Sequence, residues 1–278
     1  MSRATISGQA PAVLTTGVVV IVACIPFAWA VITSLKSETN AMTFPPSFVP
    51  SPATLESYRR VVTQDSFLTG LWNSVAYAAG AVLLSLLVGV PAGYAAARMS
   101  PAVRRRVMLG VLASAMVPSV ALLVPTYMIL DAMGLLNSHL AIIVIMAARL
   151  CPQTVWFIEN FVQALPPDIE EAALVDGARR RQVLLRLVVP LIAPGIAAVA
   201  ILGIVSCWND YVTVAAFAPA LATRTLQVAI VDQVFDSIGV SWSFFMAFAI
   251  VSSMPIILLF LAAQRWFVAG LTAGAVKA

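Results

Sequence analysis

Charged residues are scarce in this sequence, and their scarcity excludes a water-soluble fold. Only 10% of the 278 residues are charged, whereas 61% are hydrophobic, and the mean hydropathy is +0.98. A typical soluble domain carries about 25% charged residues. Too few polar side chains are present to cover a surface in water, so lipid must be the solvent for much of the chain.

Cysteine and histidine are also rare, which argues against several kinds of site. The three cysteines lie in separate apolar runs, and the one histidine is His139. Without a CxxC pair or a Cys/His cluster, the sequence predicts neither a disulfide framework nor a metal site. Catalytic pairs such as HExxH or GxSxG are missing, so we expect no catalytic residue. No basic stripe with interleaved aromatic residues occurs, so nucleic acid is not an expected partner.

Six apolar stretches are each long enough to cross the ~30 Å hydrocarbon core of a bilayer as a helix. The first exceeds the apolar core of a cleaved signal peptide, so we expect it to be retained. Prolines interrupt most of the stretches, which a membrane bundle tolerates as kinks. The sequence therefore predicts an all-α, multi-pass membrane protein with one domain over residues 1–278. The expected helices lie near residues 13–33, 68–97, 107–130, 140–162, 188–218 and 244–267.

The distribution of Lys and Arg predicts the orientation in the membrane. With the N-terminus in the cytoplasm, 11 of these residues fall on the cytoplasmic side, 4 fall outside, and Arg149 lies within a span. The positive-inside rule therefore places both termini in the cytoplasm. Two long segments, Lys36–Phe67 and Pro219–Trp242, are then external, where they could meet a partner or serve only as connectors.

The cytoplasmic segment 165–190 has the pattern of two short helices joined by a turn. Pro167 followed by acidic residues is typical of a helix start, because proline fits the first turn and carboxylates complement the helix dipole. Gly177 suits the left-handed residue that ends a helix. Three arginines, Arg179 to Arg181, then begin a second helix that leads into the next span. We expect this segment to project from the membrane as a docking element.

This segment resembles the EAA loop of permease subunits in binding-protein-dependent ABC importers. Glu171-Ala172-Ala173, three residues, Gly177, nine residues and Leu187-x-Val189-Pro190 match that pattern, which has Ile and Leu where this chain has Leu187 and Val189. Trp208-Asn209-Asp210 is similar to the equivalent segment of carbohydrate permeases, and the tail from Gln264 to Lys277 is similar to that of the MalG-like subunits of carbohydrate importers. The resemblance covers nearly the whole chain, from the first span to the C-terminus.

The resemblance implies a type I importer permease fold and a role as one permease subunit of an ATP-driven sugar importer in a bacterial plasma (inner) membrane. It implies that segment 165–190 couples the chain to an ATPase. The implied partners are a second, MalF-like permease, a dimer of cytoplasmic ABC ATPase subunits, an extracytoplasmic substrate-binding protein or lipoprotein, the sugar and membrane lipid. The residues implied in coupling are Glu170, Glu171, Ala172, Ala173, Asp176, Gly177 and Pro190.

A phosphate-binding loop is missing from the sequence. Such a loop reads G-x-x-x-x-G-K-[ST], whereas the nearest match, Gly270-x-x-x-Gly274-x-x-Lys277, has the wrong spacing and no hydroxyl after the lysine. We therefore expect no cofactor in this chain and no enzymatic activity of its own. ATP and Mg would be bound by the partner ATPase subunits.

Charged residues inside the predicted spans need a reason, because each costs roughly 2.5–3.5 kcal/mol on insertion scales. Arg149 lies about 15 Å along the fourth span from His139, where it lines a substrate pathway or instead forms an internal ion pair or a contact with helix carbonyls. Trp208, Asn209 and Asp210 combine an aromatic face with planar hydrogen-bonding groups, as sugar sites do. We expect them to line the pathway, although Asp210 could instead only pair with a neighbouring helix.

A secondary transporter driven by protons or sodium is the main alternative function. It would use the charges of Arg149, Glu159 and Asp210. Such carriers typically have more spans and internal repeats, and these carboxylates are scattered along the membrane depth. We expect Glu159 and its neighbour Asn160 to serve packing or headgroup contacts instead. The nature of the sugar does not follow from composition.

Overall fold

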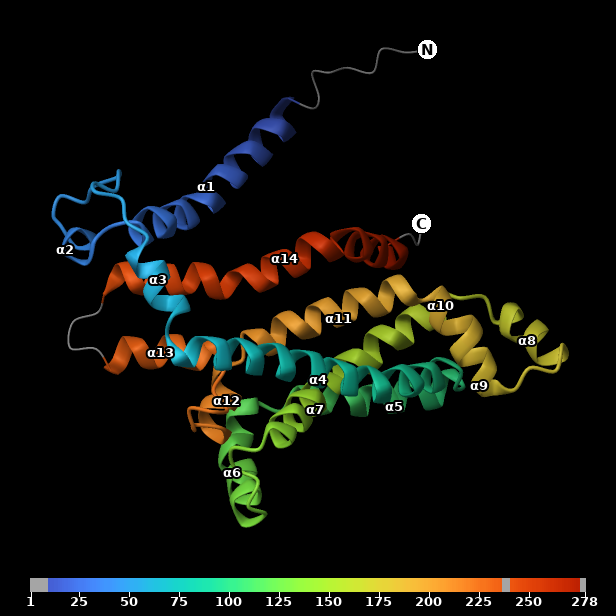
Figure 1. The fold of residues 1–278 in the computed structure, drawn as a ribbon. Coiled ribbons are helices and arrows are strands. Elements are labelled where there is room, and N and C mark those ends of the chain that lie inside the picture. The colour runs from blue at the N-terminus through green and yellow to red at the C-terminus, as the bar shows by residue number, and fades with distance from the viewer. Residues whose placement is uncertain (1–9, 237–240, 276–278) are drawn as a thin grey trace. The chain divides into compact units, whose positions relative to one another are not determined.

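The computed structural model describes residues 10–236 and 241–275, and its regular structure within these ranges is entirely helical (Figure 1). The helices, with η2 a 3-10 helix and η3 a π-helix, are α1 Ala10–Ser34, α2 Glu38–Ala41, α3 Glu56–Val62, α4 Asp65–Ala97, α5 Pro101–Ala115, η2 Ser119–Leu122, α6 Leu123–Ala132, α7 His139–Gln163, α8 Pro167–Val175, α9 Arg180–Gln182, η3 Val183–Val188, α10 Val189–Leu191, α11 Ala193–Trp208, α12 Tyr211–Phe217, α13 Leu226–Asp236 and α14 Trp242–Ala275.

The described residues contain four helices that are long and apolar enough to cross a membrane, and up to six spans if each of two bent helix pairs counts as one. The candidates formed by a single helix lie in α1, α4, α7 and α14. The bent pairs are α5 with η2 and α6, and the α9–α10 segment with α11, each bent by 75°. The all-α multi-pass fold expected from the sequence is therefore confirmed.

The expected helix near residues 107–130 is broken in the structure. The first part, α5, ends at Ala115 and the chain turns before η2 begins at Ser119. Pro118 has an extended backbone with φ −60° and ψ 123°. A proline lacks an N–H group and cannot continue the hydrogen-bonding of the preceding helix, so the span changes direction here.

The expected helix near residues 188–218 is broken twice. Ile192 separates α10 from α11 with φ −95° and ψ 8°, and a proline follows in the first turn of α11. The second break follows Trp208, and α12 begins at Tyr211 with Asp210 as its N-cap. A side chain that caps a new helix favours a break at that position, so a short separate helix replaces the end of the expected span.

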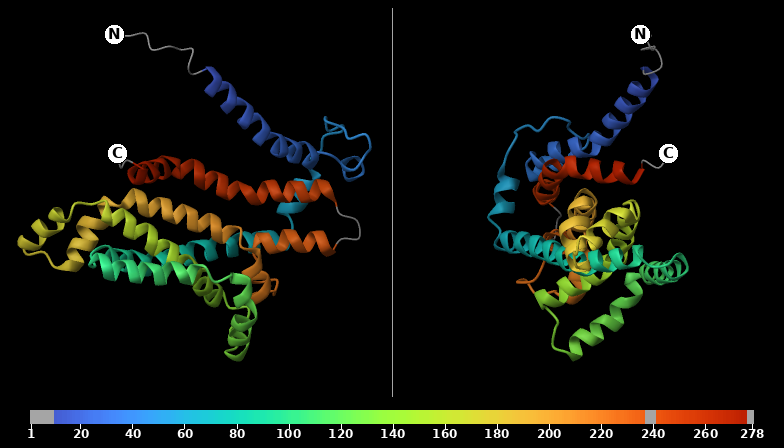
Figure 2. Two further views of the ribbon diagram at one scale, coloured as in Figure 1. Left: turned by 180° about the vertical axis from the view of Figure 1, so that it is seen from behind. Right: turned by 90° about the vertical axis from the view of Figure 1, so that its right-hand side faces the viewer.

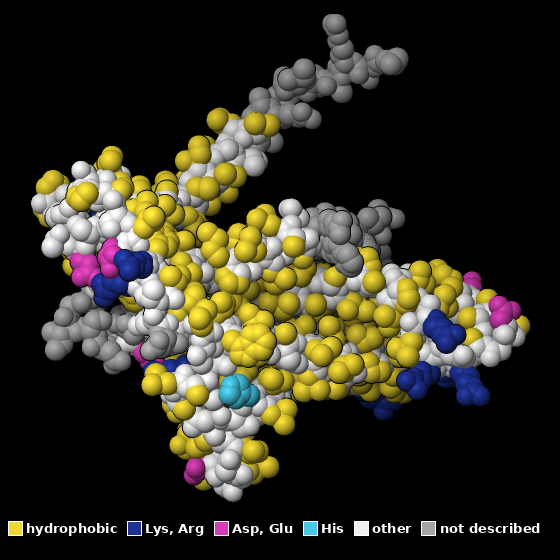
Figure 3. Space-filling view, viewed as in Figure 1, with side chains coloured by type: hydrophobic (Ala, Val, Ile, Leu, Met, Phe, Trp, Pro, Cys, Tyr) yellow, Lys and Arg dark blue, Asp and Glu magenta, His cyan; other side chains and the backbone are white. Residues whose placement is uncertain are grey.

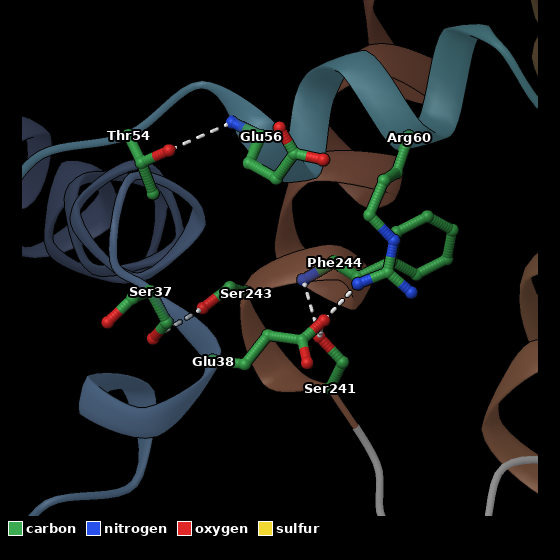
Figure 4. Close-up of polar contacts among 8 residues, drawn as sticks. All are labelled: Ser37, Glu38, Thr54, Glu56, Arg60, Ser241, Ser243 and Phe244. Atoms are coloured by element: carbon green, nitrogen blue, oxygen red, sulfur yellow. Dashed lines mark hydrogen bonds and ion pairs between the residues drawn. The ribbon is translucent and has the colours of Figure 1, made fainter.

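The chain divides into two compact units. Unit 1 comprises the described residues of 1–67 and 230–254, and unit 2 those of 68–229 and 255–278. In unit 1, Glu38 accepts hydrogen bonds from the side chains of Arg60 and Ser241 (Figure 4). The Arg60 guanidinium also lies 5.2 Å from the centre of the Phe244 ring. The bond from Ser241 and the nearby Arg60 lower the pKa of Glu38 below its usual range.

The core of unit 2 lies where α4 and α7 pack together. Buried side chains there include Tyr77 and Ala81 of α4 and Ile142 and Met146 of α7. The two helices approach closely at Gly89, where an added Cβ would lie 2.5 Å from the Thr154 side chain. Small residues permit such close approach between membrane helices, so α4 and α7 form one packed pair.

The segment α8–α10 lies at one end of unit 2, and α6 and α12 lie toward the opposite end, as two views show (Figures 1 and 2). On the face drawn in Figure 3, hydrophobic side chains cover unit 2 along its helices, whereas Lys, Arg and acidic side chains gather at the α8 end. This division matches a body surrounded by apolar neighbours whose α8 end meets water.

Candidate functional site

Helix α8 begins and ends where its sequence predicts. Pro167 is its first residue, and Asp168 and Glu170 lie in its first turn. At its end Gly177 has φ +86°, a left-handed conformation that glycine adopts without strain. The amide of Gly177 donates to the carbonyl of Leu174 at 3.1 Å and that of Ala178 to Ala173 at 3.0 Å. These bonds satisfy carbonyls of the last turn and fix the reversal of the chain.

The residues expected to couple to a partner divide between two faces of α8. Glu171 and Ala172 are exposed and Val175 is 88% exposed, so they form an outward face available for docking. Glu170 is buried and Ala173 packs against the apolar cluster of Val162 and Val183. These two residues, three apart, face the chain's own helices. Of the other residues expected to couple, Asp176, Gly177 and Pro190 are exposed.

Glu170 is held by Tyr94 of α4 and by Arg98, the residue that directly follows α4. Tyr94 donates from its hydroxyl to Oε2 at 2.8 Å. Arg98 donates to Oε1 from Nε at 3.0 Å and from Nη2 at 2.5 Å. The same Nη2 lies 3.2 Å from the carbonyl oxygen of Val162 at the end of α7. Arg98 therefore connects three elements: α4, α7 and α8.

A second ion pair lies near this end of unit 2. Glu159 of α7 is buried, and its Oε1 lies 3.6 Å from Nε of Arg104 on α5. The sequence assigned Arg98 and Arg104 only to membrane topology, so it missed both pairs. A sequence signal for these pairs did exist: the carboxylates of Glu159 and Glu170 fall on the same predicted side of the membrane as the two arginines. Asn160 is exposed and donates to the carbonyl of Trp156.

Arg149, near the middle of α7, forms an ion pair with Asp210, the N-cap of α12. Nη2 of Arg149 lies 2.7 Å from Oδ2 of Asp210. Nη1 donates to Oγ1 of Thr213 at 3.3 Å, and the Thr213 amide donates to Oδ1 of Asp210 at 3.1 Å. Asp210 thereby caps α12 and binds α7 through one carboxylate. The internal ion pair that the sequence left open is thus present.

The same arginine lines a cavity of about 500 Å³ bounded by α5, η2, α6, α7 and α12. The Arg149 side chain is 35% exposed, whereas that of Asp210 is 4% exposed. The ion pair therefore presents its guanidinium side to the cavity. The polar residues of the lining are Ser114, Ser119, Thr126, Arg149, Gln153 and Thr213.

Trp208 and Asn209 are not brought to this cavity. Trp208 is buried, and Asn209 is exposed with its amide donating to the carbonyl of Val205 at 2.9 Å. Of the residues expected to line a pathway, Arg149 reaches the cavity wall and Asp210 supports it. The chemistry available there is hydrogen bonding rather than catalysis, because a guanidinium and hydroxyls offer donors and acceptors for a polar solute.

Metal ligands are not clustered in the part of the chain that the structure describes. No group of three or more His, Cys, Asp or Glu side chains in residues 10–236 and 241–275 is arranged to hold a metal ion.

A model of the family described as "Binding-protein-dependent transport system inner membrane component" matches residues 89–273. The sulfoquinovosyl glycerol transport system permease protein SmoH of Agrobacterium fabrum is 31% identical over 272 residues, which cover 98% of this chain and 95% of that protein. The trehalose transport system permease protein SugB of Mycobacterium tuberculosis is 33% identical, with 92% of this chain and 93% of that protein covered.

The trehalose/maltose transport system permease protein MalG of Thermococcus litoralis is 29% identical, with 92% of each chain covered. Among solved structures, one described as a bacterial ABC transporter involved in the import of the acidic polysaccharide alginate contains a chain with a TM-score of 0.79. It is 23% identical and covers 96% of this chain and 99% of that chain. The fold is therefore shared with the permease chains of ABC importers.

Proposed function

The chain belongs to the family of binding-protein-dependent transport system inner membrane components, and from this premise we propose that it is one permease subunit of an ATP-driven sugar importer. The family is the membrane component of such systems, and the chain is a multi-pass membrane protein. Sugars are the proposed substrate class because relatives over nearly the whole chain are named for trehalose, maltose and sulfoquinovosyl glycerol.

The observation that carries the coupling role is helix α8. It lies at the charged end of unit 2 and presents Glu171, Ala172 and Val175 outward while Glu170 binds the chain's own helices. An exposed helix face with apolar and acidic side chains is suited to insertion into a groove on a partner. We assign that partner as a dimer of cytoplasmic ATPase subunits, which would bind the ATP and Mg. In this proposal both termini of the chain are also cytoplasmic.

The further partners follow from the same proposal. A second, MalF-like permease would complete the pathway, and an extracytoplasmic binding protein or lipoprotein would deliver the sugar. Both units have exposed apolar side chains, such as Val19 and Phe27 of α1 and Leu83 and Leu87 of α4. Such surfaces suit lipid and a second membrane subunit.

The cavity beside Arg149 is the proposed part of the sugar pathway within this chain. Arg149 would donate to sugar hydroxyls and the Thr213 hydroxyl would donate or accept, while Asp210 keeps the arginine in place. A role in the pathway for Trp208 and Asn209 stays a prediction. ATP binding would close the ATPase dimer, carry α8 with it and open the cavity outward, and hydrolysis would reset it. No residue of this chain breaks a bond in that cycle.

Co-purification tests the docking role of α8. We expect Glu171→Arg to reduce the amount of ATPase that co-purifies with the tagged chain, because it reverses the charge of the exposed face. Arg105→Gln is the control, because Arg105 is an exposed residue of α5. Equal recovery of ATPase with wild-type and Glu171→Arg chains would contradict the assignment of α8.

A further inference from the structure

We infer that Tyr94, Arg98 and Glu170 form a rigid joint through which α8 moves α4, so that the motion of the motor reaches the pathway through α4 and α7. This inference rests on the proposed function, since it presumes that α8 is carried by an ATPase. It gives Glu170 a task different from that of the neighbouring Glu171. Glu170 transmits the motion inside the chain, whereas Glu171 meets the partner.

The joint uses both oxygens of one carboxylate. Tyr94 donates to Oε2, and two nitrogens of Arg98 donate to Oε1. Tyr94 lies in the last turn of α4 and Arg98 directly follows its last residue, and both side chains reach the same carboxylate. Hydrogen bonds between ionised groups are among the strongest in proteins, and donors on both oxygens, Arg98 on Oε1 and Tyr94 on Oε2, restrict the orientation of the carboxylate. The first turn of α8 is thereby fixed in both position and direction against α4.

Burial makes the joint resist opening. The Glu170 side chain is 9% exposed and that of Arg98 is 21% exposed. Separating the pair would leave a carboxylate out of water without its counter-charge, which is strongly unfavourable. Arg98 also donates to the Val162 carbonyl at the end of α7. A displacement of α8 that broke these bonds would therefore cost more free energy than one that carried α4 along.

The covalent route from α8 onward to α11 is more easily bent. After α8 the chain passes Gly177 with φ +86°, the π-helix η3 and the 75° break at Ile192. Glycine turns, π-helical segments and proline-associated breaks are the usual places where helices bend. Part of any displacement would be absorbed along that route. The joint to α4 contains no such break, and α4 and α7 each continue as one helix past their internal prolines, Pro91 and Pro152.

Tight packing continues the path from α4 to the cavity. The hydroxyls of Ser85 and Thr154 lie 2.7 Å apart, and Gly89 leaves no room for a side chain beside Thr154. Thr154 lies on the same helix, α7, as Arg149, which lines the cavity and binds Asp210. Since α4 and α7 interlock, a shift of α4 displaces the helix that carries the arginine.

The test uses the complete complex, in which this chain is reconstituted with its second permease, ATPase and binding protein in liposomes. Uptake of the sugar and hydrolysis of ATP are measured in the same vesicles, together with the amount of assembled complex. The variants are Glu170→Gln, the charge exchange Arg98→Glu with Glu170→Arg, and the control Arg105→Gln on the exposed side of α5. A merely structural role would lower the amount of complex but leave uptake per ATP unchanged.

We expect Glu170→Gln to lower uptake per ATP by roughly fivefold or more, which is the usual lower range of a coupling effect. The charge exchange should restore uptake per ATP to at least half of the wild-type value, and Arg105→Gln should match the wild type. An unchanged ratio in Glu170→Gln, or a charge exchange that recovers nothing, would overturn the joint. If Glu170→Gln yields no assembled complex, Tyr94→Phe is tested instead, since it removes one donor to Glu170 and keeps the ion pair. Wild-type uptake per ATP in Tyr94→Phe would then refute the joint.

Failure of the joint is distinguishable from failure of the proposed function. If the joint is wrong, the wild-type complex still takes up sugar only with ATP, and the Glu170 variant does so with equal efficiency. If the proposed function is wrong, the wild-type complex itself shows no ATP-driven uptake.

Discussion

Two arginine–carboxylate pairs in unit 2 have the same chemistry and different surroundings. Arg98 and Glu170 join helix ends, and Glu170 receives three donors. Arg149 and Asp210 lie beside a cavity of about 500 Å³, and the arginine remains 35% exposed. The first pair has most of its hydrogen-bonding capacity satisfied within the chain, whereas the second retains donors for a solute. Residue type alone therefore does not distinguish an ion pair that joins helices from one that lines a binding cavity. The presence or absence of open space beside the pair does.

Breaking the first pair should have the largest effect on stability. Arg98→Leu leaves the Glu170 carboxylate buried without its counter-charge, and we expect a loss of about 3–5 kcal/mol in the free energy of unfolding. Thermal unfolding of the purified chain in detergent measures it. The double variant Arg98→Leu with Glu170→Leu should be less destabilised than Arg98→Leu, because no unpaired charge remains. Equal destabilisation of both variants would show that the pair is not what stabilises this end.

The close packing of α4 against α7, which lies between the two ion pairs, should give the next largest change in stability. Gly89→Ala places a Cβ 2.5 Å from the Thr154 side chain, so we expect a destabilisation of about 1–3 kcal/mol from overpacking. Gly110→Ala on α5 is the matched control, because nothing lies within 4 Å of its added Cβ. It should be neutral or slightly stabilising, since alanine favours a helix. The melting temperatures of the Gly89→Ala and Gly110→Ala chains are compared. If Gly89→Ala were as stable as the control, the close α4–α7 contact would be contradicted.

Removing the arginine of the second pair should lower uptake, and it should also destabilise the chain, because Asp210 is 4% exposed and loses its counter-charge; uptake is therefore expressed per assembled complex. Arg149→Leu deletes donors that face the cavity, and we expect uptake to fall roughly tenfold, as for a lost hydrogen bond from a charged group. The amount of assembled complex serves as the control. Normal uptake by Arg149→Leu would remove this arginine from the pathway and leave only its ion pair with Asp210.

The smallest expected effect lies in unit 1, at an exposed carboxylate. The bond from Ser241 lowers the pKa of Glu38. A lowered folded-state pKa contributes stability that is present above the unfolded pKa and lost as pH falls through the folded pKa. Ser241→Ala should raise the pKa of Glu38, measured by carboxyl carbon NMR during acid titration. Ser243→Ala is the control, because that hydroxyl bonds to the Ser37 carbonyl; equal titration of Glu38 in both variants would contradict the role of Ser241.

Local sequence patterns predicted much of the fold and the limits of α8. Apolar length indicated the spans, and Pro167 and Gly177 indicated where α8 begins and ends. Such features depend on a few consecutive residues. The break at Asp210 also had a local signal, since its side chain accepts from the amide of Thr213 three residues later. The sequence pattern was interpreted there as a continuous apolar span, and the capping signal was overlooked.

The pairing of distant residues could not be predicted in the same way. Arg98 and Glu170 are 72 residues apart in the chain, and which face of α8 turns inward depends on the packing of α4 and α7. Glu170 and Glu171 are adjacent and chemically identical, yet one is buried and the other exposed. The two faces of α8 became distinguishable only once the helix was placed against its neighbours.

ATP-dependent uptake in sealed liposomes tests the central claim most directly. The account predicts that labelled sugar accumulates when this chain is reconstituted with the second permease, the ATPase and the binding protein, and only when ATP is supplied to the ATPase side. Liposomes that contain this chain alone should accumulate nothing. Accumulation by the chain alone, driven by a proton or sodium gradient and unaffected by ATP, would contradict the account.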